Sequence, residues 1–368
     1  MTVRKLKYLT LTIIVLTAVC VLCACRAATK SSAERALKRL LTVDFSYVGE
    51  KRSEELVEYF FIDENGVEFS YSSAYTSAGL DGATFYHYWN NSTDYVQASV
   101  DFNKDALLAL CEGSGLYCEY GEYADISIHV ENKYDIETAA KLVCDLANKQ
   151  GTIHIKKTSD APYSMPEMRV LYGAGSYSGT SFYFPIDGED LPELDGVKDT
   201  ITKDYAQFVR ENPKYNDMTE SELADIPPQS LFVTVDGIEI EGAEFYLFDD
   251  GKYYIELSNL TPSNGRYMGI IAFDELCSEL GIENSFSETA LFWRINGSRY
   301  STRYVEDTGM DILKDGKVIC TLEVYYDYQE SYLCKAAPDD FALMLDCSYD
   351  IDNVRGFINF MSKQGGAA

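Results

Sequence analysis

The sequence predicts an α+β protein with two mixed domains rich in antiparallel hairpins, the second a duplicated strand–helix–hairpin unit. Its 368 residues are 46% hydrophobic, enough to build globular cores. A chain of this length suits two domains of roughly 100–200 residues each. Short alternating runs joined by Asn-Gly and Asp-Gly turns predict hairpins. Amphipathic helix patterns are mixed among these strands, which is typical of α+β domains.

The first 24 residues have the pattern of a secretory signal peptide. Arg4, Lys5 and Lys7 form a basic start, and residues 9–23 follow without a charge. This apolar run is shorter than the ~20 residues that span a bilayer as a helix. We therefore expect residues 1–24 to direct the chain to export.

The end of the apolar run, Leu22-Cys23-Ala24-Cys25, resembles the lipobox of bacterial lipoproteins, although Cys23 stands where Ala, Ser or Thr is commoner. The resemblance implies that Cys25 becomes the lipidated first residue of the mature chain. A diacyl group there would anchor the protein to the cell membrane, facing the extracellular side. A signal that is uncleaved, or cleaved without lipidation, is the alternative.

The charge balance limits the partners. The chain has 59 acidic and 31 basic side chains, a net charge of −28. This argues against nucleic acid, because neutralising phosphates requires an excess of Lys and Arg. Residues 25–41, the expected tether and first helix, are basic by contrast. They fit contact with anionic headgroups, and an ordinary tether followed by a helix is the simpler interpretation.

Residues 42–185 form the expected N-terminal α+β domain. Asn103 is expected to cap a helix that runs to Cys111, and Asp135 a strongly amphipathic helix that stops before Gly151. Residues 72–91 are rich in Gly, Ser and Asn, and the aromatic run 85–89 interrupts them. The expected strands are 54–62, 67–71, 95–102, 125–130, 152–156 and 168–172, the first two joined by an Asn-Gly turn.

Residues 186–228 predict an acidic, partly helical bridge. A helix is expected over residues 200–210, and Thr219 and Glu222 have capping-box spacing at the start of a short one. Four prolines interrupt the bridge, which ends at Pro227-Pro228.

Residues 229–368 form the second domain, in which the duplicated unit is expected. A link carrying Cys347 and Tyr349 joins its last helix to its last strand. The helices are predicted over residues 270–280 and 339–345. The strands are predicted within 231–240, 253–257, 290–295, 299–304, 318–326, 332–335 and 354–360.

The layout of this domain resembles the copper amine oxidase N-terminal (stalk-like) domain of exported bacterial proteins. The matching segments are 233–237, 252–255, 273–281, 349–350 and 353–354. The family's Pro and Arg are missing from 255–258 and 333–336, and Tyr349 replaces its Trp. The resemblance implies an envelope setting and a role in contacts. It implies no copper chemistry, because the oxidase's catalytic domain and His ligands have no counterpart here.

Three motifs resemble known chemical sites. Residues 173–179 resemble a dinucleotide-binding Gly-rich loop, but a strand-like run follows where a helix should start, so a hairpin loop is expected. Residues 101–112 have EF-hand carboxylate spacing, but Ala106 stands where the loop needs Gly. The third motif is an acidic turn that consists of Asp346, Ser348, Asp350 and Asp352. Its oxygens either face solvent or bind a calcium ion, and both interpretations stay open.

The cysteines and histidines point to structure rather than chemistry. Seven cysteines remain after Cys25, an odd number without a CxxC spacing, so at least one is a free thiol or makes an intermolecular bond. The four in apolar, helix-like stretches are expected to be buried hydrophobes. They are Cys111, Cys144, Cys277 and Cys347. The three histidines, His87, His129 and His154, are scattered.

These observations predict a non-enzymatic, membrane-anchored lipoprotein that acts as a binding or scaffolding module, in contact with cell-wall glycan or an envelope protein. No metal, cofactor or catalytic residue is expected. The alternative is an extracellular hydrolase that cleaves glycan or peptide with paired carboxylates, since 59 acidic side chains offer many pairs. The hydrolase predicts a deep cleft with a carboxyl of raised pKa.

Overall fold

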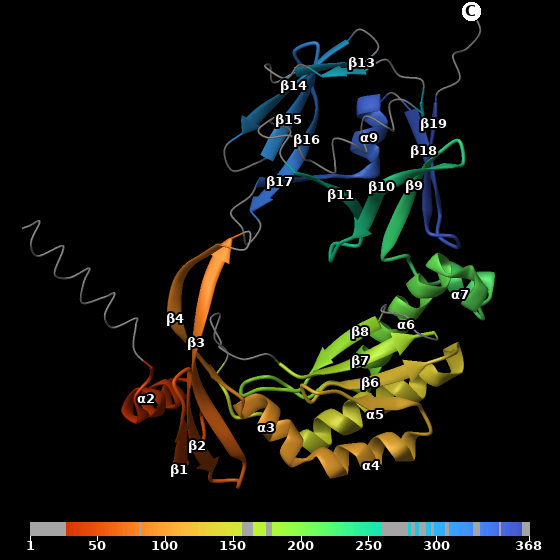
Figure 1. Ribbon diagram of the computed structural model, residues 1–368. Helices are drawn as coiled ribbons and strands as arrows, with labels where there is room; N and C mark the ends of the chain where they lie inside the picture. Colours follow the sequence, from red (N-terminus) through yellow and green to blue (C-terminus); the bar gives the residue numbers. More distant parts are fainter. Residues whose placement is uncertain are drawn as a thin grey trace, which may run out of the picture. The chain divides into compact units, whose positions relative to one another are not determined.

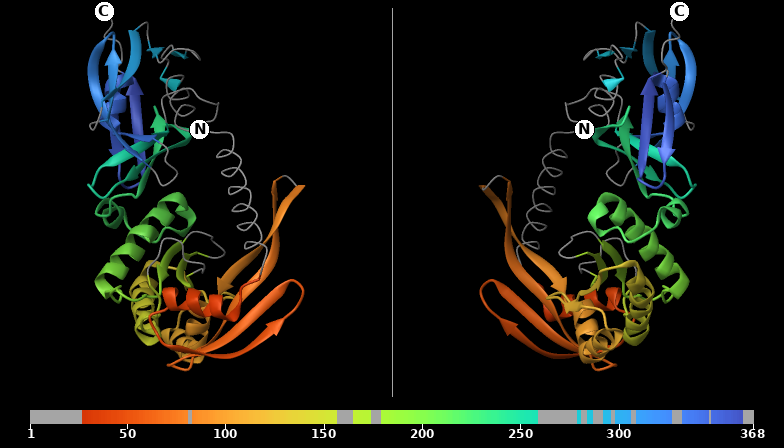
Figure 2. Two further views of the ribbon diagram at one scale, coloured as in Figure 1. Left: turned by 90° about the vertical axis from the view of Figure 1, so that its left-hand side faces the viewer. Right: turned by 90° about the vertical axis from the view of Figure 1, so that its right-hand side faces the viewer.

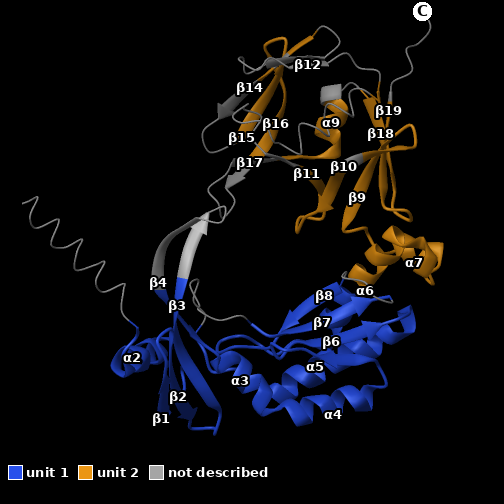
Figure 3. Ribbon diagram, in the orientation of Figure 1, with its two compact units in different colours: residues 1–201 blue, residues 202–368 orange. Residues whose placement is uncertain are grey.

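The computed structural model is a mixed α+β protein, so the predicted fold class is confirmed (Figure 1). Its described residues form three sheets, mostly antiparallel. Two compact units divide the chain, residues 1–201 and 202–368 (Figure 3). The structure describes residues 27–80, 83–156, 165–173, 179–258, 279–280, 284–286, 292–295, 298–305, 309–326, 332–345 and 347–362.

Unit 1 begins with an antiparallel sheet whose strands follow chain order. The predicted Asn-Gly turn is confirmed: Asp63 Oδ1 accepts hydrogen bonds from Asn65 N (2.9 Å) and Val67 N (2.8 Å), and Gly66 has φ 89°. The Gly-, Ser- and Asn-rich residues 72–91 extend the third strand and form the fourth (Figure 2). The strands are β1 (Phe45–Arg52), β2 (Leu56–Asp63), β3 (Glu68–Leu80) and β4 (Ala83–Thr93).

The two faces of this sheet differ because side chains alternate along each strand. One face, the apolar face, is buried and includes Tyr59 and Tyr71, which are paired across β2 and β3. The other, the polar face, carries Glu58 opposite Ser72. Helix α2 (Lys30–Leu40), the expected first helix, contacts the apolar face, with Lys30 Nζ 3.8 Å from the ring centroid of Tyr47.

The prediction of a strand over residues 95–102 is wrong. These residues form helix α3 (Tyr95–Phe102), and α4 (Lys104–Ser114) follows. Burial recurs at Tyr95, Val96, Ser99 and Val100, which is a helical spacing, so packing overrides the strand preference of the β-branched residues. Asn103 precedes α4 as predicted, but its amide donates to Gln150 Oε1 (3.2 Å) instead of capping the helix.

A second sheet completes unit 1, in the order β5-β6-β7-β8. The predicted amphipathic helix is confirmed as α5 (Ile136–Gln150), although Asp135 makes no side-chain cap. α5 lies in the connection between the parallel strands β6 and β7. The expected strand at 152–156 makes only two isolated bridges, at Ile153 and Ile155. The strands are β5 (Cys118–Tyr120), β6 (Ile126–Val130), β7 (Glu167–Tyr172) and β8 (Gly179–Tyr183).

The predicted bridge is helical. α6 (Leu194–Glu211) contains the expected helix and the boundary between the units. α7 (Glu220–Ala224) begins with the predicted capping box, in which Glu222 N donates to Thr219 Oγ1 (3.2 Å) and Thr219 N to Glu222 Oε2 (2.7 Å).

Unit 2 is built on a sheet that has eleven strands within the described residues, in the order β12-β13-β14-β15-β16-β17-β11-β10-β9-β19-β18. Among these, β9 and β19 pair in parallel. The strands are β9 (Ser230–Val235), β10 (Ile238–Leu247), β11 (Tyr253–Ser258), β12 (Asn284–Phe286), β13 (Phe292–Ile295), β14 (Ser298–Val305), β15 (Gly309–Lys314), β16 (Lys317–Tyr326), β17 (Tyr332–Ala336), β18 (Cys347–Asp352) and β19 (Phe357–Ser362).

One prediction for unit 2 is wrong: residues 347–352 are a full strand rather than a link. β12 and β15 form where the sequence predicts no strand. The expected helix over 339–345 is confirmed as α9 (Pro338–Leu345). The helix expected over 270–280 lies outside the described residues except for 279–280, so the duplicated unit stays a prediction.

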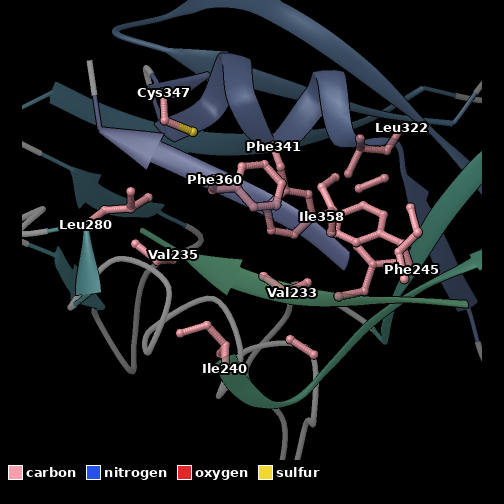
Figure 4. Close-up of a cluster of buried hydrophobic side chains, with 14 of the residues drawn as sticks. Val233, Val235, Ile240, Phe245, Leu280, Leu322, Phe341, Cys347, Ile358 and Phe360 are labelled. Atoms are coloured by element: carbon pink, nitrogen blue, oxygen red, sulfur yellow. The ribbon is translucent and has the colours of Figure 1, made fainter. Parts of the chain in front are cut away.

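An apolar cluster fills unit 2 between α9 and the strands (Figure 4). Phe245 from β10, Phe341 from α9 and Phe360 from β19 have ring centroids 5.6–6.3 Å apart. Aromatic pairs at such distances add about 0.5–1.5 kcal/mol each beyond the area that they bury. They join the middle of the sheet to its covering helix.

Arg210, in α6, is buried, with 9% of its surface exposed. Its guanidinium donates to Leu223 O (2.7 Å) within α7 and to Ile226 O (2.6 Å) just after this helix, and its Nε donates to Asn353 O (3.1 Å). Burial lowers the pKa of Arg210. Gly356, at φ 76°, leaves room for it, since a Cβ there would lie 3.3 Å from Arg210 Cδ. Arg210 thus joins α6, the end of α7 and the β18–β19 turn.

We predict that Arg210→Met lowers the free energy of unfolding by about 3 kcal/mol or more, because several buried carbonyls lose their donor. Urea unfolding followed by circular dichroism measures the change. Arg355→Met is the control, since its side chain is 76% exposed and we expect a change below about 0.5 kcal/mol. Equal effects of the two substitutions would contradict the role of Arg210.

Candidate functional site

A pocket of about 760 Å³ opens in unit 1, beside the polar face of the first sheet. Its volume lies within the roughly 300–1,000 Å³ range of small-molecule sites. The lining combines hydroxyl, carboxylate and amide groups from strands of both sheets, from α3 and from the β5–β6 loop. It comprises Glu58, Ser70, Ser72, Ser92, Thr93, Asp94, Val96, Gln97, Tyr123, Asp125, Met165, Pro166, Glu167 and Arg169.

The wall formed by β3 and the end of β4 is held by Asp94. Its carboxylate accepts from Ser70 N (2.6 Å) and from Ser70 Oγ (3.0 Å). Thr93 Oγ1 donates to Ser70 O (2.8 Å). Because charge-assisted bonds to carboxylates are the stronger kind, this corner of the pocket is fixed before any ligand arrives.

The loop between β5 and β6 supplies the opposite wall. Ala124 is fully buried and has φ 63°, a left-handed conformation that costs a non-glycine residue about 1 kcal/mol or more. It separates Tyr123, which is 64% exposed, from Asp125. Asp125 O accepts from Gly121 N (2.8 Å), and its Oδ1 accepts from Glu167 N (2.8 Å). The strained loop therefore presents an aromatic ring and a carboxylate to one pocket.

Glu167, at the start of β7, is the most extensively bonded acid of the pocket. Its carboxylate accepts from Arg169 Nε (2.8 Å), Ser181 Oγ (2.9 Å) and Tyr183 OH (3.4 Å). Partial burial opposes ionisation, but these donors prevail and lower the pKa of Glu167. It is a fixed anion at neutral pH.

The pocket is formally acidic and rich in acceptors. Four carboxylates face one guanidinium, and Arg169 is already paired with Glu167. The carboxylates accept hydrogen bonds from sugar hydroxyls, the hydroxyls of the pocket both donate to them and accept from them, and an exposed tyrosine offers an apolar face. A phosphate-rich or carboxylate-rich ligand would be repelled. The chemistry suits a neutral or amine-bearing polyhydroxyl compound.

We predict that Glu167→Gln removes a pH-dependent part of the stability of unit 1. A carboxyl with a lowered pKa stabilises the fold above its ordinary value of 4.5 and loses that contribution as pH falls below it. Urea unfolding at pH 7 and at about pH 3.5 should show the advantage of the wild type shrinking at the lower pH. A difference unchanged between the two conditions would contradict this.

The sites considered from the sequence do not form this pocket. Cys25 lies outside the described residues, so its lipid stays a prediction. Asp346 lies outside them as well, and Ser348, Asp350 and Asp352 belong to strand β18, not to an acidic turn. Asp352 accepts from Val354 N (3.1 Å) and Arg355 N (3.0 Å), which closes the β18–β19 turn.

The other motifs serve the fold. Residues 174–178 lie outside the described part of the Gly-rich loop, and the antiparallel pairing of β7 and β8 confirms the expected hairpin. Asp101 accepts from Tyr120 OH (2.7 Å). Within the described ranges, no group of three or more His, Cys, Asp or Glu residues is arranged to hold a metal ion. Nor is any described helix long and apolar enough to cross a membrane.

Three cysteines are buried as predicted: Cys111, Cys144 and Cys347. Cys277 lies outside the described residues. His129, in β6, stacks obliquely on Tyr117 with the ring centroids 4.9 Å apart. His154 Nδ1 lies 3.4 Å from Asp187 Oδ1. The side chain of His87 lies outside the described part of β4.

Sequence reasoning missed every residue of the pocket. Its members come from stretches around residues 58, 70, 94, 123 and 167, and only the pairing of distant strands brings them together. Gly121 and Asp125 flank an exposed aromatic residue in a short loop, and this pattern could have marked the loop as a candidate site. It does not indicate which distant strands complete the pocket.

The structure is a two-unit α+β protein with a polar, acceptor-rich pocket in its N-terminal unit. No protein-family model matches the chain, and no curated protein and no solved structure matches it. The resemblance of residues 229–368 to the copper amine oxidase N-terminal domain therefore stays a prediction from the residues quoted for it.

Proposed function

We propose that this chain is a membrane-anchored extracellular lipoprotein that acts without catalysis, as a binding module whose pocket takes a cell-wall glycan. The observation that carries the proposal is the pocket itself. It has about 760 Å³ of space, a preformed set of hydroxyl and carboxylate groups, and the exposed ring of Tyr123. The lipobox ending at Cys25 supplies the setting.

The pocket favours a sugar ligand over an anionic polymer. Glycans offer hydroxyl donors to Asp94, Asp125 and Glu167, and a flat apolar ring face to Tyr123. Neutral and amine-bearing sugars meet no repulsion from these carboxylates, whereas phosphate-rich envelope polymers do. We therefore expect peptidoglycan-type glycan to bind and polyphosphate chains not to bind.

Binding accounts for the carboxylates better than hydrolysis does. A general acid needs a raised pKa, whereas hydrogen bonds lower the pKa of Glu167. Burial raises the pKa of Asp340, but this residue lies at the start of α9, where its carboxylate accepts from Ala337 N (2.9 Å). Its role there is to cap a helix. Release of soluble sugars from glycan by the purified protein would instead favour the hydrolase.

We predict that Tyr123→Ala weakens retention on purified peptidoglycan roughly tenfold, because one stacking ring is worth about 1.4 kcal/mol. Tyr134→Ala is the matched control, since Tyr134 is 79% exposed and lies outside the pocket. A sedimentation assay measures the bound fraction. Equal retention of both variants, or no retention of the wild type, contradicts the glycan proposal.

We predict that Cys25→Ser abolishes incorporation of a labelled fatty acid, because the thiol is the acylated group. Cys23→Ser, two residues away, keeps the small residue at that place and should be labelled like the wild type. Mass spectrometry of the mature N-terminus measures both. Labelling of the Cys25→Ser variant would overturn the proposed anchor.

A further inference from the structure

We propose that the apolar-face side of the first sheet lies in the headgroup region of the membrane and that a defined surface contacts the lipid there. This surface, the headgroup face, consists of Arg35, Lys38 and Arg39 on α2 and the aromatic pair Tyr75 and Trp89 on β3 and β4. The inference rests on the proposed lipid at Cys25 and adds how the unit meets the bilayer.

Ala28, three positions after the proposed anchor at Cys25, is hydrogen-bonded to the sheet. Ala28 N donates to Ser73 Oγ (3.1 Å), and Tyr59 OH donates to Ala28 O (2.8 Å). Ser73 and Tyr59 both belong to the apolar face of the sheet. Two residues separate Cys25 from Ala28, so the lipidated cysteine reaches at most roughly 11 Å from this attachment. A lipid there holds this side of the sheet next to the bilayer.

Helix α2 turns a basic stripe outward. Arg35, Lys38 and Arg39 are exposed and recur at helical spacing, on the side opposite the buried Ala33 and Leu37. No ion pair joins the three to a described carboxylate. In a chain of net charge −28, such a stripe is unusual. Anionic headgroups attract basic residues within a Debye length of the surface.

The aromatic pair continues the same side of the sheet. Tyr75 and Trp89 are direct cross-strand partners with ring centroids 5.4 Å apart, and Tyr75 is 43% exposed. Tyr75 lies two residues beyond Ser73, about 7 Å along the strand and on the same face. Tyrosine and tryptophan are the side chains that gather at membrane–water interfaces, because their rings are apolar and their polar groups stay hydrated.

The strand register places the candidate glycan pocket on the other side. Glu58 and Ser72, which line the pocket, alternate with Tyr59 and Ser73, which hold the N-terminal segment. The headgroup face and the pocket are thus on opposite faces of one sheet. With the lipid engaged, the pocket opens away from the bilayer and stays accessible to the wall.

The two tryptophans of the chain, Trp89 and Trp293, make the contact measurable. The lipidated full chain is bound to vesicles of phosphatidylcholine with phosphatidylglycerol, in which part of the lipid carries brominated acyl chains. Trp293→Phe leaves Trp89 as the only tryptophan, and vesicles without bromolipid are the control. We expect bromolipid to reduce the emission of Trp89 at least twofold. Emission of Trp89 that bromolipid leaves unchanged overturns the proposal.

A charge test uses the same reporter. Replacing Arg35, Lys38 and Arg39 together with Gln should reduce the quenching of Trp89 on the anionic vesicles by roughly half. The matched control replaces three exposed lysines of unit 1 with Gln and should leave it unchanged. They are Lys104, Lys141 and Lys149. An equal effect of both triple variants overturns the role of the stripe.

Flotation of the vesicles separates this inference from the proposed anchor. Protein that floats while Trp89 is not quenched keeps the anchor and overturns the headgroup face. Trp89 that is shielded from a soluble quencher but not quenched by bromolipid is covered by a second copy of the chain rather than by lipid, and this also overturns it. Protein that does not float overturns both.

Discussion

The alternation of side chains in the β1–β4 sheet is the constraint on which the N-terminal unit depends. Tyr59, Phe61 and Tyr71 are buried on one face, so Glu58 and Ser72 must lie on the other. A slip of one residue would exchange the two faces and destroy both the core and the pocket. The turn held by the Asp63 carboxylate fixes the register of β2 against β3, and with it which side chains lie on each face.

The two faces of this sheet make different contacts. The apolar face takes α2 and the first described residues of the chain, while the polar face contributes to a pocket completed by the β5–β6 loop and β7. The strain at Ala124 makes sense in this arrangement, because a relaxed loop would not present Tyr123 and Asp125 together. The strained backbone of Ala124 lowers the stability of the loop, and it holds this wall of the pocket in place without a ligand.

Sequence reasoning succeeded where the signal was local. The Asn-Gly turn at 65–66, the amphipathic α5 and the capping box of Thr219 each need only a few neighbouring residues. It failed for residues 95–102, where β-branched residues favour a strand and tertiary burial selects a helix. The pocket could not be predicted, because its members meet only through the pairing of strands far apart in the chain.

The buried Arg210 limits which substitutions the C-terminal unit tolerates. A Cβ at position 356 would lie 3.3 Å from Arg210 Cδ, and the turn there has φ 76°. The arginine and the glycine therefore depend on each other: a side chain at position 356 crowds the arginine, and loss of the arginine leaves carbonyls unsatisfied. A substitution at either position is therefore best tolerated when the other position changes with it.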